Sequence, residues 1–245
     1  EEGADLLDVG GESTRPGAEA VDEATELARV LPVIERLVAK TSVPISVDTT
    51  KPGVMRAALA AGAGMVNDVM ALRSEGALDA VAASKAAVVL MHMQGEPRTM
   101  QAAPAYDDVV GEVHRFLAER VFACEMAGID KRRIVVDPGF GFGKALEHNM
   151  ALLAQLNRFT ELGVPVLAGL SRKSSLGQIT GRGVDERVAA SVAAHLVAVQ
   201  NGALFVRVHD VAATVDALKV WQAVAAVPVP KGKPAASTIR WPDEE

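Results

Sequence analysis

The sequence has very few cysteines and aromatic residues and no excess of positive charge, and each shortage excludes a class of protein. Cys124 is the only cysteine among 245 residues, so no intrachain disulfide can form and a structural zinc site is not expected. A lone thiol in an apolar helical stretch is typical of a small core residue. The expected compartment is the reducing cytoplasm.

The hydrophobic content is high although aromatic residues make up only 4% of the chain. Hydrophobic residues reach 49%, mostly Ala, Val and Leu, which favours helices packed on a parallel sheet over an aromatic-cored sandwich. No apolar run approaches the roughly 18 residues of a membrane span. The net charge of −6 argues against a nucleic-acid partner, but charges converging in a pocket can still bind a small anion.

A repeating unit runs along the chain: a short apolar run, a polar or glycine-rich loop, and a segment of helical period. The runs are Leu6–Val9, Pro44–Val47, Met65–Val66, Ala87–Met91, Ile134–Val136, Val164–Leu170 and Leu204–Val208. Each has the length of a strand buried on both faces. Parallel strands joined by helices predict an α/β fold with right-handed crossovers.

Seven such units are one short of a closed TIM (β/α)8 barrel. Residues 1–5 resemble the end of a helix entering a strand, so we expect the first β/α unit to be missing from this chain. A doubly wound sheet remains an alternative, because a strand count does not decide closure. We predict one barrel domain over residues 1–227 and a poorly ordered tail over residues 228–245, where Pro, Lys, Ser and acidic residues mix.

Polar residues follow nearly every apolar run, and the carboxyl ends of barrel strands carry the active site. These segments are Asp8–Arg15, Asp48, Asn67-Asp68, His92, Asp137–Lys144, Ser171–Ser174 and Arg207–Asp210. We therefore predict a single convergent pocket. His92 and the loop after it are expected at its rim, without a catalytic role.

Three of these segments suggest their own chemistry. Buried carboxylates and amides pair with the edge of a heterocycle, although Asp48 and Asn67 could each cap a helix instead. Ser171–Ser174 precedes a helical stretch, which suggests an anion site rather than a solvated charge cluster. Arg207 and His209 lie two residues apart, so both can face the barrel mouth and hold diphosphate oxygens.

Six motifs together resemble dihydropteroate synthases, in order and from about residue 3 to residue 225. They are Gly10–Gly17, Ser46–Thr49, Asn67-Asp68, Asp137–Lys144, Ser171–Ser174 and Arg207–Asp210. That family of transferases, the target of sulfonamides, condenses 6-hydroxymethyl-7,8-dihydropterin diphosphate with p-aminobenzoate and releases pyrophosphate in folate synthesis. Two alternatives are a pterin-binding domain of a corrinoid methyltransferase and a non-catalytic paralogue. The first alternative does not explain the motifs at Ser171–Ser174 and Arg207–Asp210, because such a domain needs no site for a diphosphate and a carboxylate.

The resemblance also implies roles for individual residues. It assigns the pterin to Asp48, Asn67, Met91, Asp137, Gly169 and Lys173, p-aminobenzoate to Thr14, Pro16, Phe142 and Ser174, and pyrophosphate to Arg15, Arg207 and His209. Asp48, Lys173, Arg207 and His209 would be the catalytic residues. The resemblance further implies a Mg²⁺ cofactor and a homodimer. The family's Mg²⁺-supporting asparagine lies on a loop that no segment of this chain matches, so no metal ligand is expected here.

Overall fold

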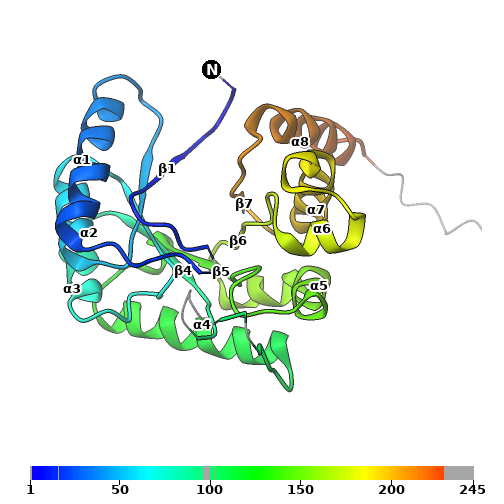
Figure 1. The fold of residues 1–245 in the computed structure, drawn as a ribbon, viewed down its shortest axis with the longest axis horizontal. Coiled ribbons are helices and arrows are strands. Elements are labelled where there is room, and N and C mark those ends of the chain that lie inside the picture. Colours follow the sequence, from blue (N-terminus) through cyan, green and yellow to red (C-terminus); the bar gives the residue numbers. More distant parts are fainter. Residues whose placement is uncertain (1, 16, 96–99, 102, 229–245) are drawn as a thin grey trace, which may run out of the picture.

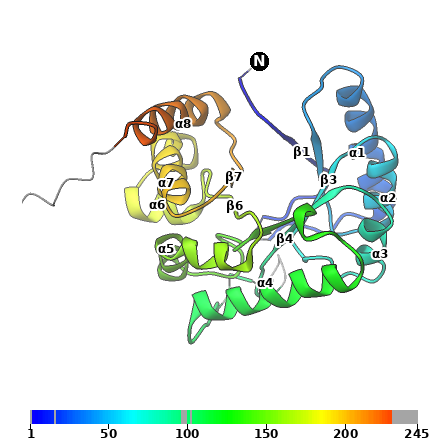
Figure 2. The same ribbon diagram turned by 180° about the vertical axis from the view of Figure 1, so that it is seen from behind.

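The fold is a parallel α/β barrel, seen in a computed structural model that describes residues 2–15, 17–95, 100, 101 and 103–228 (Figures 1 and 2). Its strands are β1 (Leu7–Gly10), β2 (Ile45–Asp48), β3 (Met65–Asp68), β4 (Ala87–Met91), β5 (Ile134–Asp137), β6 (Leu167–Ala168) and β7 (Phe205–Val206). All seven lie where the apolar runs predicted them. The predicted tail, apart from Pro228, lies outside the described residues.

The first five strands pair in chain order into one parallel sheet, and β6 pairs with β7. A single bridge between Val136 and Val166 joins the two sheets. Within the described residues no strand pairing closes β7 onto β1, although a side-chain cluster joins their ends. The last two strands are shorter than predicted. An apolar run indicates which residues are buried, but it does not show how many of them pair through their backbones.

Helices surround the strands, with α1 to α3 on one side, α6 to α8 on the other, and α4 and α5 between them (Figures 1 and 2). The helices are α1 (Glu23–Val38), α2 (Pro52–Ala60), α3 (Ala77–Ala82), α4 (Val109–Met126), α5 (Leu146–Ala154), α6 (Ser174–Thr180), α7 (Val188–Gln200) and α8 (Val211–Ala225), with short 3-10 turns at Lys131–Arg133, Leu156–Leu162 and Val184–Glu186. None of the helices in the described ranges is both long and apolar enough to cross a lipid bilayer.

Local sequence signals explain several helix ends. The side chain of Asp108 caps α4 by accepting a hydrogen bond from the backbone N–H of Gly111 at 3.0 Å. Gly128 follows α4 with a positive φ of 87°, which a glycine adopts without strain. Pro52 begins α2, where its missing N–H leaves no helical hydrogen bond unmade.

Alternation along the strands divides the core in two. Met65, Val89, Val135 and Leu167 pack together as one small cluster, contributed by four different strands. Their sequence neighbours, such as Val88 and Ile134, pack instead in the larger core that includes helix residues. Successive strand residues face opposite sides, so the first cluster fills the barrel and the second lies between the sheet and its helices. The barrel is therefore packed, and only its mouth is left for ligands.

Candidate active site

A polar cluster joins the last strand of the barrel to the first three. Arg207, directly after β7, donates from Nε to Asp8 Oδ2 at 2.7 Å and from Nη2 to Asp48 Oδ2 at 3.0 Å. Asn67 on β3 donates from Nδ2 to the same Asp8 oxygen at 3.2 Å. Asp48 and Asn67 are buried, whereas the Arg207 side chain is 49% exposed. The structure thus brings three predicted residues together and leaves part of the guanidinium open to solvent.

Two carboxylates lie close together in this cluster. Burial and the charge of Asp8 raise the pKa of Asp48 to about 7, while the charge of Arg207 opposes both effects. Asp8 Oδ1 is buried and accepts no hydrogen bond from the residues that the structure describes. Ligand N–H groups at this point would gain acceptors that the protein itself does not use. Asp8 begins the predicted pocket segment Asp8–Arg15 but was assigned no role, because its role depends on a partner 199 positions away.

Asp137 lies at the carboxyl end of β5, as predicted, and is only 7% exposed. Its Oδ1 accepts the backbone N–H of Gly139 at 2.7 Å. A side-chain carbon built on Gly169 would lie 4.0 Å from Asp137 Oδ2 and 3.9 Å from Arg207 Cβ. Glycine at position 169 therefore keeps open the space beside Oδ2. Burial raises the pKa of Asp137, although the Gly139 hydrogen bond and the charge of Lys173 oppose that shift.

Lys173 and Phe142 form a cation–π pair next to Asp137. The Lys173 Nζ lies 4.3 Å from the centre of the Phe142 ring. Burial lowers the pKa of Lys173 to about 8, and the charge of Asp137 opposes that shift. A carbon added to Gly141 would come within 3.3 Å of Lys173 Cδ. The predicted pterin lysine and the predicted aminobenzoate phenylalanine are therefore direct neighbours.

The side chains of the segment Ser171–Ser174 do not all face one point. Arg172 turns to Asp210, with Nη2 to Oδ1 at 2.6 Å and Nε to Oδ2 at 3.0 Å. Its backbone has a φ of 55°, outside the usual range for this residue type, and Ser191 Oγ accepts its N–H at 2.9 Å. The reversal at Arg172 leaves Lys173 in the site and Ser174 at the start of α6, where Ser174 is exposed.

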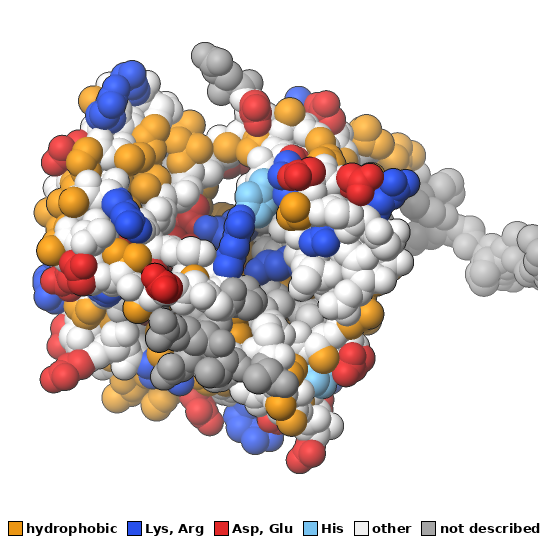
Figure 3. Space-filling model, viewed as in Figure 1, with side chains coloured by type: hydrophobic (Ala, Val, Ile, Leu, Met, Phe, Trp, Pro, Cys, Tyr) orange, Lys and Arg blue, Asp and Glu red, His pale blue; other side chains and the backbone are white. Residues whose placement is uncertain are grey.

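His209 lies beside Ser171. Its Nδ1 is 2.9 Å from Ser171 Oγ, and its backbone N–H donates to the same oxygen at 3.1 Å. Burial lowers the pKa of His209, and so do the charges of Arg172, Arg207 and Arg15. Figure 3 shows Lys and Arg side chains gathered at the hollowed centre of one face, with a histidine beside them. Such a concentration of positive charge favours an anionic ligand.

The glycine-rich loop after β1 carries Thr14 and Arg15, and Pro16 lies outside the described residues. Arg15 is exposed, and its charge lowers the pKa of both Lys173 and His209, which places it on the same side as the site. Glu12 holds the base of the loop, because its Oε1 accepts the N–H of Val21 at 2.8 Å and its Oε2 pairs with Lys51.

Met91 is buried where predicted, packed with Val69, Met93 and Met100 against Phe142. The rim position expected for His92 is wrong, since only 7% of that residue is exposed. His92 contacts Lys144, a buried cation that was not among the predicted site residues. Lys144 ends the predicted pocket segment Asp137–Lys144, but its burial was not predicted, because lysines are seldom buried without a counter-charge.

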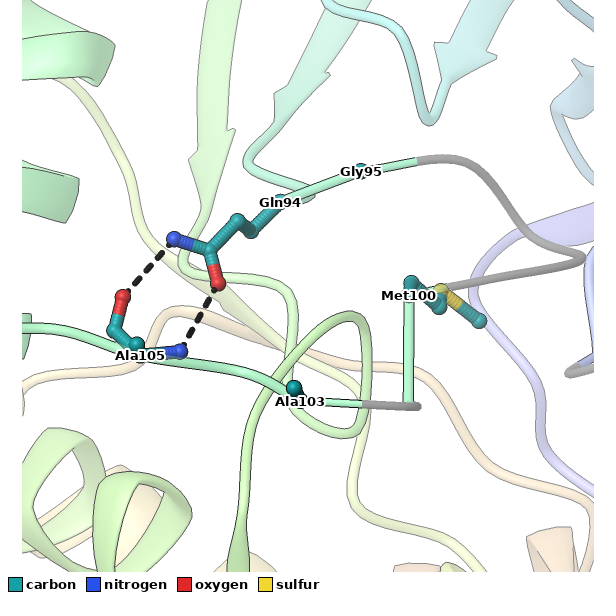
Figure 4. A pocket seen from close by; sticks show the side chains of 5 residues that line it. All are labelled: Gln94, Gly95, Met100, Ala103 and Ala105. Carbon is teal, nitrogen blue, oxygen red and sulfur yellow. Dashed lines mark hydrogen bonds between the residues drawn. The ribbon is translucent and has the colours of Figure 1, made fainter.

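The segment after His92 folds back on itself around a small pocket (Figure 4). Two hydrogen bonds join the side chain of Gln94 to the backbone of Ala105: its Nε2 donates to the Ala105 carbonyl at 2.9 Å and its Oε1 accepts the Ala105 N–H at 3.3 Å. Gly95, Met100 and Ala103 complete the lining. Among the described residues that line it, none carries a charged side chain and none was a predicted site residue.

Comparison with known proteins identifies the family. The model of the family described as "Pterin binding enzyme" matches residues 1–209. The chain belongs to the dihydropteroate synthases. The Haemophilus influenzae dihydropteroate synthase is 52% identical over 225 residues, which cover 92% of this chain and 82% of that protein.

Solved structures of dihydropteroate synthases agree with the fold. The Xanthomonas albilineans enzyme with 4-aminobenzoic acid is 71% identical, with a TM-score of 0.89 over 93% of this chain and 81% of that one. The same enzyme in complex with 7,8-dihydropteroate gives 67% identity and a TM-score of 0.85, with the same coverage. The architecture is accordingly the TIM barrel of these enzymes rather than a doubly wound sheet. The function is that of a dihydropteroate synthase, a transferase of folate biosynthesis.

Proposed function

We propose that this chain joins 6-hydroxymethyl-7,8-dihydropterin diphosphate to p-aminobenzoate at the mouth of the barrel. The observation that carries the proposal is the arrangement around Asp137. An unused carboxylate oxygen, a cation stacked on an aromatic ring and a partly exposed guanidinium lie side by side. The X. albilineans synthase structures that contain 4-aminobenzoic acid and 7,8-dihydropteroate support this choice of substrates.

The pterin is assigned to the acidic side of the mouth. Its amino-pyrimidinone edge presents N–H donors, which Asp137 accepts, while Asn67 supplies both a donor and an acceptor. Asp48 lies beside them, and Met91 offers an apolar surface to the flat ring. Gly169 leaves room for the ring beside Asp137, and Lys173 donates to a pterin acceptor.

The aminobenzoate is assigned to the side of Phe142. The ring of Phe142 forms one wall, and Thr14, on the loop after β1, would form the other. Ser174, at the start of α6, is assigned the carboxylate. Its exposed side chain lines a recess that also includes Asn149 and Gln178, which leaves it accessible to a ligand.

Substitution at the pterin methylene needs the carbon–oxygen bond to break as negative charge builds on the diphosphate. Arg207 donates to it through the N–H groups that face away from Asp8 and Asp48, Arg15 adds positive charge, and His209 adds a further hydrogen-bond donor. Asp48 lies where positive charge develops on the pterin. The amine of p-aminobenzoate then attacks the methylene, held in line by the neighbouring subsites.

Mg²⁺ fits this site only as a partner of the diphosphate. The described residues contain no group of three His, Cys, Asp or Glu side chains suited to a metal, and Arg207 already occupies the nearest carboxylates. Mg²⁺ commonly binds through phosphate oxygens with few protein ligands. When bound, it would neutralise charge on the leaving group, while the residues above hold and orient both substrates.

The direct test is pyrophosphate release from the pterin diphosphate and p-aminobenzoate, measured with Mg²⁺ and after its removal by EDTA. We expect release that needs both substrates and falls sharply without Mg²⁺.

Arg207→Lys should lower kcat/KM about 30-fold, because lysine keeps the charge but loses the forked contact. Arg132→Lys, at a position 88% exposed and paired with Asp130 alone, is the matched control and should have no effect. Folded protein that releases no pyrophosphate would instead favour a non-catalytic paralogue.

We further propose that the chain forms a homodimer through α7, α8 and the segments that directly follow these two helices. Large apolar side chains are exposed there: Leu204 71%, Val224 69%, Val220 66%, Val227 62% and Val197 40%. Figure 3 shows hydrophobic side chains near the same end of the molecule. The helices α7 and α8 pack against each other, and exposed apolar side chains on adjacent elements are typical of protein interfaces.

Replacing Val220 and Val224 together by aspartate should convert the dimer to monomer in sedimentation velocity at micromolar concentration. Charges at the centre of an apolar interface are desolvated without partners, which strongly disfavours association. The comparison variant is Met126→Asp on α4, where an equally apolar side chain is 71% exposed. If only the α4 variant dissociates, the interface lies on α4, and the proposal of an interface on α7 and α8 is wrong.

A further inference from the structure

Lys144 is a buried cation for which the proposed reaction has no use. Only 3% of the residue is exposed, and among the described residues no carboxylate lies within ion-pair distance of it. Its Nζ lies 2.9 Å from His92 Nδ1, 3.1 Å from the Phe142 carbonyl and 3.4 Å from the His92 carbonyl. Its polar contacts with described residues therefore belong to two segments, those that follow β4 and β5.

These two segments touch along their backbones. The N–H of His92 donates to the Asp137 carbonyl at 3.0 Å. A side-chain carbon on Gly139 would lie 1.9 Å from the His92 carbonyl oxygen, and one on Gly143 would lie 2.3 Å from that of Gln94. Lys144 reaches across this contact and binds carbonyls on both sides of it.

Burying the ammonium is unfavourable, which makes its presence informative. Burial and the charge of Lys173 lower the pKa of Lys144 to about 7, although the charge of Asp137 opposes that shift. Burial also lowers the pKa of His92 to about 3, so the ring is neutral and Nδ1 accepts a hydrogen bond from Lys144. An apolar side chain would avoid this cost but could not hold either segment.

The held segment carries Phe142. The Phe142 carbonyl accepts from Lys144, and the ring packs against the cluster around Met91 with Lys173 Nζ at 4.3 Å. Asn149 holds the same turn from the far side, by accepting the Gly141 N–H at 2.7 Å. The position of the Phe142 ring thus follows from the anchoring of its backbone.

We infer that Lys144 is a positioning residue, which ties the end of β4 to the loop after β5 and so fixes the Phe142 wall of the aminobenzoate subsite. This inference rests on the proposed function for the identity of the second substrate. It assigns to Lys144 no contact with either substrate.

The test compares Lys144→Met with wild-type enzyme in steady-state kinetics and in pterin binding by calorimetry without aminobenzoate. Methionine has similar length and keeps the packing but cannot donate. We expect the KM for p-aminobenzoate to rise about tenfold, with pterin affinity changed less than about threefold. Lys85→Met, at an exposed position, is the matched control and should change neither value.

A double-mutant cycle with Phe142→Ala separates positioning from a general loss of structure. If Lys144 acts through Phe142, its removal should raise the KM for p-aminobenzoate little further once the ring is gone. Additive effects, or equal losses of pterin and aminobenzoate binding, would overturn the inference. Should Lys144→Met fail to fold, Lys144→Gln, which keeps a hydrogen-bonding NH2 group but loses the charge, allows the same cycle. A wild-type enzyme without pyrophosphate release would contradict the proposed function instead.

Discussion

Asp137→Asn is expected to weaken binding of the pterin diphosphate about 100-fold, or about 2.7 kcal/mol. Asp137 Oδ1 already accepts the Gly139 N–H, so only Oδ2 faces the ligand. The asparagine variant has one side-chain oxygen, which can accept a hydrogen bond from the Gly139 N–H or from the pterin, but not from both. One orientation sets an amide donor against the pterin donors, and the other leaves the buried N–H of Gly139 unpaired. Calorimetric titration with the pterin diphosphate, in the absence of p-aminobenzoate, measures the loss directly.

The same substitution should not harm folding, which separates recognition from stability. Burial raises the pKa of Asp137, so its ionised form destabilises the folded chain increasingly as the pH rises above the pKa of the unfolded chain. A neutral asparagine removes that cost, and we expect the thermal midpoint at pH 7.5 to stay equal or rise. Asp216→Asn, at an 81% exposed side chain, is the control and should alter neither measurement. Affinity within about threefold of wild type would rule out Asp137 as the pterin acceptor.

The sequence predicted those parts of the fold that depend on local pattern. Strands such as β4 and helices such as α4 follow from apolar periodicity and from the cap at Asp108. Asp48, Asn67 and Asp137 were found because they directly end buried strands, where the barrel architecture brings them to one face.

The rest depends on contacts between distant residues, which no local pattern encodes. Asp8 gains its importance from Arg207 at the other end of the chain. Arg172 was grouped with Lys173 by sequence, yet the positive φ at Arg172 turns the two side chains to different partners. Lys144 is buried only because two loops meet over it. Contacts between loops that are distant in sequence decide where side chains at strand ends point. At these positions the sequence predicted the residues but not their partners.

Gly139→Ala should prevent stable folding or lower the free energy of unfolding by at least about 4 kcal/mol. Two effects act together at this position. Its φ of 73° is unfavourable for a residue with a side chain, and the added carbon would lie 1.9 Å from the His92 carbonyl oxygen. Neither neighbour can yield easily, since Asp137 Oδ1 holds the Gly139 N–H on one side and the Asp137 carbonyl holds the His92 N–H on the other.

Gly181→Ala separates the two effects, because Gly181 has nearly the same φ of 68° but nothing within 4 Å of an added carbon. It should cost only about 1 kcal/mol, the penalty of the backbone conformation alone. Urea unfolding of both variants against wild type gives the comparison, and the difference between them measures the contact between the ends of β4 and β5. Equal losses in the two variants would mean that this contact relaxes at little cost. In that case Asp137 and Phe142, which lie on either side of Gly139, would be less firmly placed than the proposed reaction requires.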